Sequence, residues 1–337
     1  MEDNNKIVPP HLNAEVYRTD TTGTSTMFYL EYLKFYEDGS TLIGCSELTG
    51  RYWNGGANIF EDINKACKLQ KSEKKSIILN SGTADGCFVS SPNKVLLCED
   101  SGAVSLWTSS EEDQKNAWSQ WREEISVAEH DNAVLSVGCL DPGTEYVTAG
   151  ADGNVKVWDI KDMICIKNYS AAHSKAIYGV AVRSNSKTNF ATGSMDQYIS
   201  LWDENIEKPV LDLYRNDCGV RCLQWIDENK LIFGDEAGIL KVIDVRTCES
   251  LFQLAEFPAA VHKIDINYES GKVAVCCDNK IVTVCDMNED AKVKTIYQKR
   301  QAHSNFVRGV AWGLEDNKTL YSLGWDGEIK THSIVFD

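Results

Sequence analysis

The sequence predicts an all-β fold, a single seven-bladed β-propeller. Short stretches rich in β-branched and aromatic residues alternate with clusters of Gly, Asp, Asn and Ser, which is typical of many short strands. Similar segments recur at a step of about 43 residues, as from Asp152 to Asp196, and four strands per blade need about that length. Seven such units fill the chain of 337 residues.

The two clearest repeats begin with histidine and end with Trp-Asp. They read HDNAVLSVGCLDPGTEYVTAGADGNVKVWD from His130 and HSKAIYGVAVRSNSKTNFATGSMDQYISLWD from His173. Their alignment places four residues of the first repeat beside four of the second: His130, Thr148, Asp152 and Trp158 beside His173, Thr192, Asp196 and Trp202. We expect each set to form a buried chain of hydrogen bonds from carboxylate to imidazole, hydroxyl and indole N–H. Because the set recurs, we interpret it as structural and not as a catalytic triad.

Other copies of this pattern are partial. One has His303, Ser322 and Asp326, with His332 at the tryptophan position, and another begins with His262 and Asp278 and ends at Cys285-Asp286. Two segments, VRCLQWIDENKLIFGDEAGILKVID and GCFVSSPNKVLLCEDSGAVSLW, keep the strand, turn and strand pattern without the histidine. The seventh unit starts near Phe28, where EDGS supplies a turn.

A propeller must join its first and last blades. We expect residues Ala14 to Asp20 to add the outer strand of the blade that contains Gly324 to Ile334, which would hide both open edges. This divides the chain into a flexible segment, 1–13, and one propeller domain, 14–337. Two connections break the repeat: Asp62 to Ser81 is lysine-rich, and Thr108 to Ala128 is either a long connection or a short helix over EDQKNAWSQWREE.

Composition narrows the function. The formal net charge of -16 disfavours binding to nucleic acid and anionic membranes and leaves basic proteins as partners, although the charge could also serve solubility alone. The 12 cysteines include no CxxC pair, so we expect reduced thiols. No GxSxG, P-loop, GxGxxG or HExxH motif occurs, which predicts no enzyme activity, no cofactor and no metal site. The N-terminus lacks a signal peptide and no apolar run has the length of a membrane span, which predicts a soluble intracellular protein.

Several passages, however, resemble one family: GCSELTGRYWNGGANIFED, DSGAVSLW, EHDNAVLSVG, FGDEAG, QAHSNFVRGVAW and LGWDGEIKTH. The chain is similar to the methylosome protein 50 family, the WD-repeat subunit that accompanies the type II protein arginine methyltransferase. The resemblance implies a non-catalytic scaffold in the cytoplasm and nucleus, forming a hetero-oligomer with that enzyme and presenting histone and Sm protein tails for symmetric dimethylation. It also implies partner-binding roles for Arg51, Tyr52, Trp53, Tyr297 and Phe306.

The residues themselves favour Trp53 as an anchor, because aromatic and arginine side chains in a turn such as GRYWNGG are typical of interfaces. Ordinary packing is the alternative. Two other functions stay open: another WD-repeat adaptor, such as a ubiquitin-ligase substrate receptor or histone-binding chaperone, and a propeller enzyme. Propellers serve many functions, so the fold by itself does not decide among them.

Overall fold

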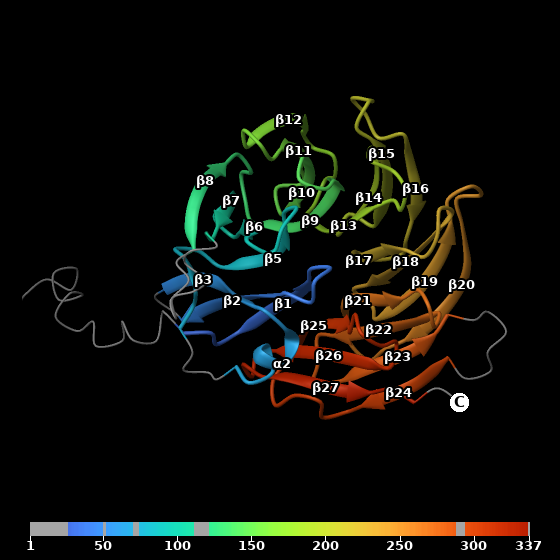
Figure 1. Cartoon of the computed structure of the whole chain (residues 1–337). Helices are drawn as coiled ribbons and strands as arrows, with labels where there is room; N and C mark the ends of the chain where they lie inside the picture. Colours follow the sequence, from blue (N-terminus) through green and yellow to red (C-terminus); the bar gives the residue numbers. More distant parts are fainter. Residues whose placement is uncertain (1–25, 50–51, 70–73, 111–120, 288–293, 336–337) are drawn as a thin grey trace, which may run out of the picture.

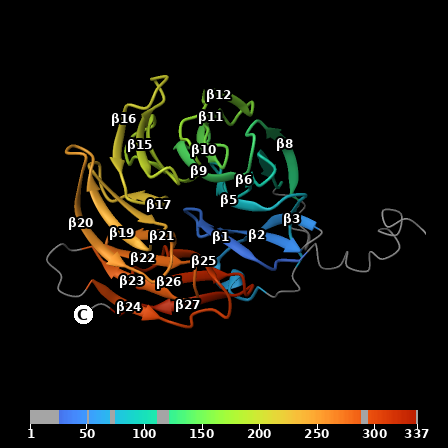
Figure 2. The same ribbon diagram turned by 180° about the vertical axis from the view of Figure 1, so that it is seen from behind.

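The computed structural model describes residues 26–49, 52–69, 74–110, 121–287 and 294–335, which form seven antiparallel sheets arranged in a closed ring (Figures 1 and 2). The prediction of a seven-bladed β-propeller is confirmed. Segments 1–13 and Ala14 to Asp20 lie outside the described residues, so the closing strand stays a prediction.

The strands follow the chain from the inside of each blade to its outside. The first three blades are β1 (Leu30–Phe35), β2 (Thr41–Thr49), β3 (Tyr52–Phe60) and β4 (Ile77–Leu79); β5 (Thr83–Phe88), β6 (Lys94–Glu99), β7 (Ala103–Thr108) and β8 (Arg122–Ala128); and β9 (Val134–Asp141), β10 (Glu145–Gly150), β11 (Val155–Asp159) and β12 (Ile164–Tyr169). The fourth and fifth are β13 (Ile177–Val182), β14 (Asn189–Ser194), β15 (Tyr198–Asp203) and β16 (Leu211–Arg215); and β17 (Val220–Trp225), β18 (Lys230–Asp235), β19 (Ile239–Asp244) and β20 (Glu249–Glu256). The sixth is β21 (Val261–Asn267), β22 (Lys272–Cys277), β23 (Val282–Asp286) and β24 (Thr295–Lys299), and the seventh is β25 (Val307–Trp312), β26 (Thr319–Gly324) and β27 (Ile329–Ser333).

The second strand of most blades is almost wholly buried, because neighbouring blades cover both of its faces. Strands such as KVLLCE, NFATGS and KVAVCC are buried at every position after the first. Outer strands differ, since β12 alternates between exposed and half-buried residues until its last position. This explains why second strands read as continuous runs of apolar or small residues, whereas outer strands carry only a weak apolar pattern.

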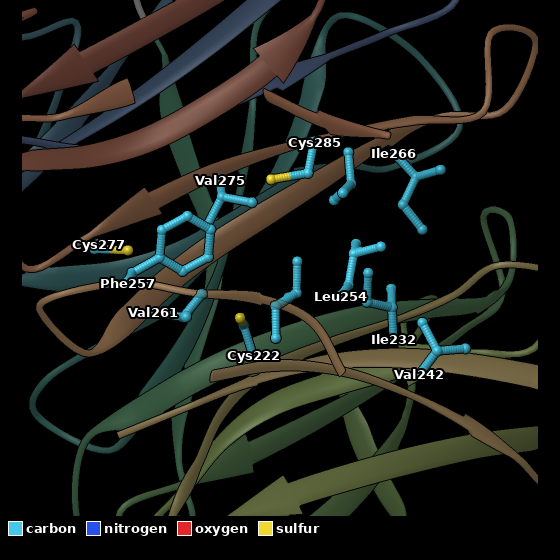
Figure 3. Packing of buried hydrophobic residues seen from close by; sticks show 12 residues of the cluster. Cys222, Ile232, Val242, Leu254, Phe257, Val261, Ile266, Val275, Cys277 and Cys285 are labelled. Atoms are coloured by element: carbon cyan, nitrogen blue, oxygen red, sulfur yellow. The ribbon is translucent and has the colours of Figure 1, made fainter. Parts of the chain in front are cut away.

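The hydrophobic core is divided among the joints between blades. Seven buried clusters occur in the described residues, and each one joins the faces of two adjacent blades. Figure 3 shows the joint between the fifth and sixth blades, where Cys222, Ile232 and Val242 face Val261 and Val275. The cluster between the seventh and first blades combines Leu30 and Ile43 with Ala311 and Leu323, so apolar packing closes the ring. Burying one such side chain stabilises the fold by about 1.5–3 kcal/mol, which disfavours an open arrangement.

Two expected connections contain regular structure. The lysine-rich segment after Asp62 holds the short helix α2 (Ile63–Ala66) and the outer strand β4. The segment after Thr108 ends in β8, the outer strand of the second blade, so the alternative helix is wrong for Arg122 to Glu124. All seven residues of β8 are exposed or half-buried, and this is why its polar sequence concealed a strand.

Candidate functional site

The fourth blade contains a complete buried polar chain. Asp196 Oδ2 lies 3.0 Å from His173 Nδ1, His173 Nε2 lies 2.7 Å from Thr192 Oγ1, and Trp202 Nε1 donates to the same hydroxyl at 2.8 Å. Burial lowers the pKa of His173, so its imidazole is neutral near pH 7. Burial opposes ionisation of Asp196, but His173 and backbone N–H groups outweigh it and hold the pKa of this carboxyl below its usual value. The chain links the turn, the second strand and the third strand of one sheet.

The third and seventh blades repeat this geometry. In the third, the distances from His130 to Asp152 and Thr148 are both 2.9 Å, and Trp158 donates to Thr148 at 2.8 Å. In the seventh, a separate set of four residues forms the chain: His303 contacts Asp326 at 2.9 Å and Ser322 at 2.7 Å, and Ser322 contacts His332 at 2.8 Å. All three central hydroxyls are 0% exposed, so no external substrate reaches them as nucleophiles.

The sixth blade differs from the expectation. His262 and Asp278 approach only to 3.9 Å, and they make no hydrogen bond with each other. The network histidines lie four residues before the start of their inner strands, and in the sixth blade Phe257 occupies that place. Phe257 is buried among apolar side chains (Figure 3), which removes the need for a polar chain. The assignment of His262 and Asp278 to this network is therefore wrong.

The predicted anchor segment forms the tip of a long hairpin. β2 and β3 pair from Thr41 opposite Phe60 to Thr49 opposite Tyr52, and Trp53 lies opposite Leu48. The neighbouring strands stop earlier, because β1 pairs no farther than Cys45. The tip therefore projects beyond the rest of its sheet. Arg51 lies outside the described residues, and for Tyr52 and Trp53 only the backbone is described.

Phe306 lies in the loop that enters β25 and is 40% exposed. It belongs to a row of aromatic rings on this face of the propeller. Its ring meets Trp325 edge-on at 5.7 Å, Trp325 lies 6.1 Å from Tyr29, and Tyr29 lies 4.7 Å from Phe28, which is 36% exposed. A partly exposed aromatic row is typical of a protein interface.

The family resemblance implies that Tyr297 is an exposed aromatic residue, and the structure corrects this. It lies on β24 and is half-buried. Its hydroxyl lies 3.0 Å from His332 Nδ1, so it extends the polar chain of the seventh blade into the sixth. The structure thus gives Tyr297 a part in holding two blades together, and its role in partner binding stays a prediction.

A ring of residues around the channel was not predicted from the sequence. Each inner strand has a β-bulge at its second residue, and bulges re-aim side chains. The seven residues, one per blade, are Glu31, Ala84, Leu135, Tyr178, Arg221, His262 and Arg308, and all line a cavity of about 210 Å3. We call this end of the channel the channel mouth. It shares its face with the hairpin tip and Phe306, because that face holds the starts of the inner strands and the turns between second and third strands.

A signal for this ring existed in the complete repeats. The bulge residue lies five positions after the network histidine, as in His130 and Leu135 or His173 and Tyr178. The fifth and sixth blades lack that histidine, so the alignment could not be extended to Arg221 or His262.

The cysteines are all free thiols, and half of them are buried. Burial raises the pKa of Cys45, Cys222 and Cys276 to about 12, so these thiols are protonated and unreactive at neutral pH. Within the described part of the chain, no group of three or more His, Cys, Asp or Glu side chains has a metal-binding arrangement. No helix among those residues is long and apolar enough to cross a membrane.

Comparison with known proteins agrees with this architecture. The family model of the WD domain, G-beta repeat, matches residues 122–159 and 163–203. Each match begins at an outer strand, β8 or β12, and ends with the third strand of the next blade. Sequence repeats and blades are therefore offset by one strand, so that each repeat spans a joint. With its seven sheets, the chain is a WD-repeat β-propeller protein.

Within this class, the chain is similar to WDR77 along most of its length. It is 27% identical over 307 residues to Methylosome protein WDR77 of Xenopus laevis, which covers 90% of this chain and 88% of that protein. Protein groucho of Drosophila melanogaster is 25% identical over 60% of this chain and 27% of its own length. Ribosome biogenesis protein YTM1 of Vanderwaltozyma polyspora is 26% identical over 59% of this chain and 46% of its own length. The similarity to WDR77 runs through nearly all of both chains, whereas the other two matches cover less than half of those proteins.

Proposed function

We propose that this protein is a non-catalytic scaffold subunit that binds a type II protein arginine methyltransferase and presents basic substrate tails to it. The observation that carries the proposal is the similarity to Methylosome protein WDR77 over 90% of this chain and 88% of that protein. The match to groucho, by comparison, covers 60% of this chain and only 27% of that protein.

The surface offers a suitable attachment point for the enzyme. The β2–β3 hairpin projects beyond β1, and its tip carries Tyr52 and Trp53. Phe306 and Phe28 are partly exposed on the same face. Large aromatic residues at a projecting tip can enter a partner's pocket, and such anchors dominate many interfaces.

The charge suits the proposed substrates. Histone and Sm protein tails are basic, and a chain with net charge -16 attracts them and speeds their encounter. Strand β8 contributes Glu123 and Glu124, both exposed at the outside of the second blade. Attraction of this kind weakens as salt concentration rises, because exposed charges are screened.

Binding to the methyltransferase tests the anchor. We expect Trp53→Ala to weaken the complex by at least about 2 kcal/mol, close to 30-fold in Kd, as for an interface hot spot. The control is Ile164→Ala, because Ile164 is 56% exposed on β12 of another blade and should leave Kd unchanged. Equal affinity of the Trp53 variant and the wild type would rule out Trp53 as the anchor.

Activity tests the function itself. With methyl donor and histone or Sm peptide, the propeller alone should give no dimethylarginine, and adding it to the methyltransferase should raise the rate. An enzyme equally active with and without the propeller would contradict the scaffold role, and methylation by the propeller alone would contradict its non-catalytic nature. The proposal also predicts that the tagged protein is found in both cytoplasm and nucleus by fluorescence microscopy.

A further inference from the structure

Four basic side chains gather on one half of the channel mouth. Three consecutive inner strands supply them: Arg221 from β17, His262 and Lys263 from β21, and Arg308 from β25. All four line the cavity of about 210 Å3. The proposed scaffold function uses none of these residues.

Aromatic rings hold both arginines in place. The guanidinium of Arg221 lies 4.4 Å from the ring centre of Tyr178, and that of Arg308 lies 4.8 Å from the ring centre of Trp325. Asp278 lies between them, with one oxygen 3.4 Å from Arg221 Nη2 and the other 3.3 Å from Arg308 Nη1. Both distances are long for charge-assisted hydrogen bonds, which are usually about 2.7–2.9 Å. The two stacked guanidiniums are thus oriented in advance, and their pairing with Asp278 is weak.

Hydrogen-bond donors at this half of the mouth are unused. Arg221 Nε is buried and has no hydrogen-bond partner among the described residues. His262 is 9% exposed, and its only polar contact in that part of the chain is the 3.9 Å approach to Asp278. The Lys263 ammonium makes no hydrogen bond among the described residues, although its charge lowers the pKa of the Asp85 carboxyl. Buried polar groups without partners are uncommon in native proteins, so each calls for a water, an ion or a ligand.

The local charge is positive although the whole chain is acidic. Arg221 and Arg308 face the carboxylates of Asp278 and Glu31, and Glu31 already accepts from Arg308 Nε at 3.1 Å. Lys263 adds a third positive charge, which also lowers the pKa of the buried Asp85 carboxyl. Burial is the first cause that lowers the pKa of His262 well below its usual value, and Arg308, Lys263 and Arg221 lower it further. His262 is therefore neutral, with one ring N–H available to donate.

The opposite side of the mouth carries Asp100, which has no ion-pair partner among the described residues and whose pKa is raised by burial and by Glu99. Asp100 alone would favour a basic ligand. A bound cation, however, also prefers an open aromatic face, and Arg221 and Arg308 already lie over those of Tyr178 and Trp325. The unpaired hydrogen-bond donors of the basic half outnumber the single acceptor Asp100, which favours an acidic ligand over a basic one.

We propose that the basic half of the channel mouth is a carboxylate-binding subsite that receives an aspartate or glutamate side chain of a partner protein. The guanidinium of Arg221 can donate to a carboxylate, while Lys263 and His262 donate from the neighbouring blade. The cavity is large enough for one side chain, because a cavity of about 150 Å3 holds benzene and this one measures about 210 Å3.

The test uses the full chain and histidine ring NMR signals, with the His262 signal assigned by its loss in His262→Gln. The probe is N-acetylglutamic acid α-amide, which carries one side-chain carboxylate and no other charge. Controls are the matching glutamine and arginine derivatives at equal ionic strength. We expect a saturable shift of the His262 signal with the glutamic acid probe only.

Variants then locate the binding. Arg221→Gln and Lys263→Gln should each weaken binding about tenfold or more. Arg246→Gln should not, because Arg246 pairs with Asp244 at the opposite face, after the third strand of its blade. Circular dichroism checks that each variant is folded. If Arg221→Gln is unfolded, the affinity of Lys263→Gln for the probe is the test of the proposal.

No saturable shift, an equal shift with the glutamine probe, or unchanged affinity in the folded variants would overturn the proposal. Saturation by the arginine derivative instead would show that Asp100 selects a basic ligand. These outcomes do not depend on Trp53 or on the methyltransferase. The carboxylate-binding proposal can therefore be refuted while the scaffold proposal is supported, and the scaffold proposal can be refuted while the carboxylate-binding proposal is supported.

Discussion

The substitution Thr192→Val should show how much a buried polar chain contributes to one blade. Thr192 is 0% exposed, and its hydroxyl meets His173 Nε2 at 2.7 Å and Trp202 Nε1 at 2.8 Å. His173 places Nδ1 against Asp196, so its Nδ1–H donates to the carboxylate and Nε2 accepts from the hydroxyl. The hydroxyl therefore donates to His173 and accepts from Trp202.

Valine has nearly the shape of threonine and cannot make either bond. Its methyl group would leave the Trp202 N–H and His173 Nε2 buried without partners. Each such group costs about 1–3 kcal/mol. With two such groups, we expect the free energy of unfolding to fall by about 2–6 kcal/mol.

Thr192→Ser is the matched control, because the seventh blade uses Ser322 in the same position. Serine keeps both hydrogen bonds and loses one methyl group, which costs about 1 kcal/mol. Urea unfolding of all three proteins, followed by tryptophan fluorescence and circular dichroism, gives the midpoints and slopes from which the differences are calculated. Two probes are needed, because their agreement shows whether the seven blades unfold as one unit.

The decisive quantity is the difference in unfolding free energy between the valine and serine variants. A valine variant within about 0.5 kcal/mol of the serine variant would show that the hydroxyl adds little beyond its shape. The reasoning about paired donors and acceptors in all three complete blades would then be refuted.

Two other expectations concern the seventh blade. Burial, with smaller effects from Lys299, His303 and Lys330, lowers the pKa of His332 from 6.5 to about 4. The unfolded chain therefore binds a proton at this histidine more readily than the folded chain does. The stability that is present above pH 6.5 is lost as the pH falls toward 4. Between pH 7 and pH 5, His332→Gln should lose about 2 kcal/mol less unfolding free energy than the wild type, and an identical loss in urea titrations would contradict this. Deleting residues 1–20 should lower the melting temperature of the whole domain in one cooperative step, because β27 is the outermost strand of its sheet within the described residues. An unchanged calorimetric trace would exclude these residues as the closing strand.

The repeated spacing of residues makes the fold predictable from the sequence. The spacing of His130, Thr148, Asp152 and Trp158 is local to one blade, so the same side chains meet wherever that spacing recurs. Inner and second strands were also readable, since burial on both faces requires apolar or small residues. Outer strands such as β8 were hidden, because exposure to solvent leaves their composition free.

Residues brought together from different blades could not be read in this way. His262 has the right residue type for the polar chain, yet its position after the start of β21 places it at the channel mouth, while Phe257 takes the network position. The grouping of Arg221, Lys263 and Arg308 depends on the curvature of the ring, which brings residues more than forty positions apart into one cavity.

The sequence by itself determined the blade count and the hydrogen-bonded sets within blades, because both follow from short-range spacing repeated along the chain. Only the tertiary structure decided what surrounds the channel and which hairpin projects from the rim. The surroundings of the channel depend on how sheets are placed around an axis and on one-residue bulges that redirect side chains. The projection of the hairpin depends on where β1 ends beside it, and neither feature leaves a periodic mark in the order of residues.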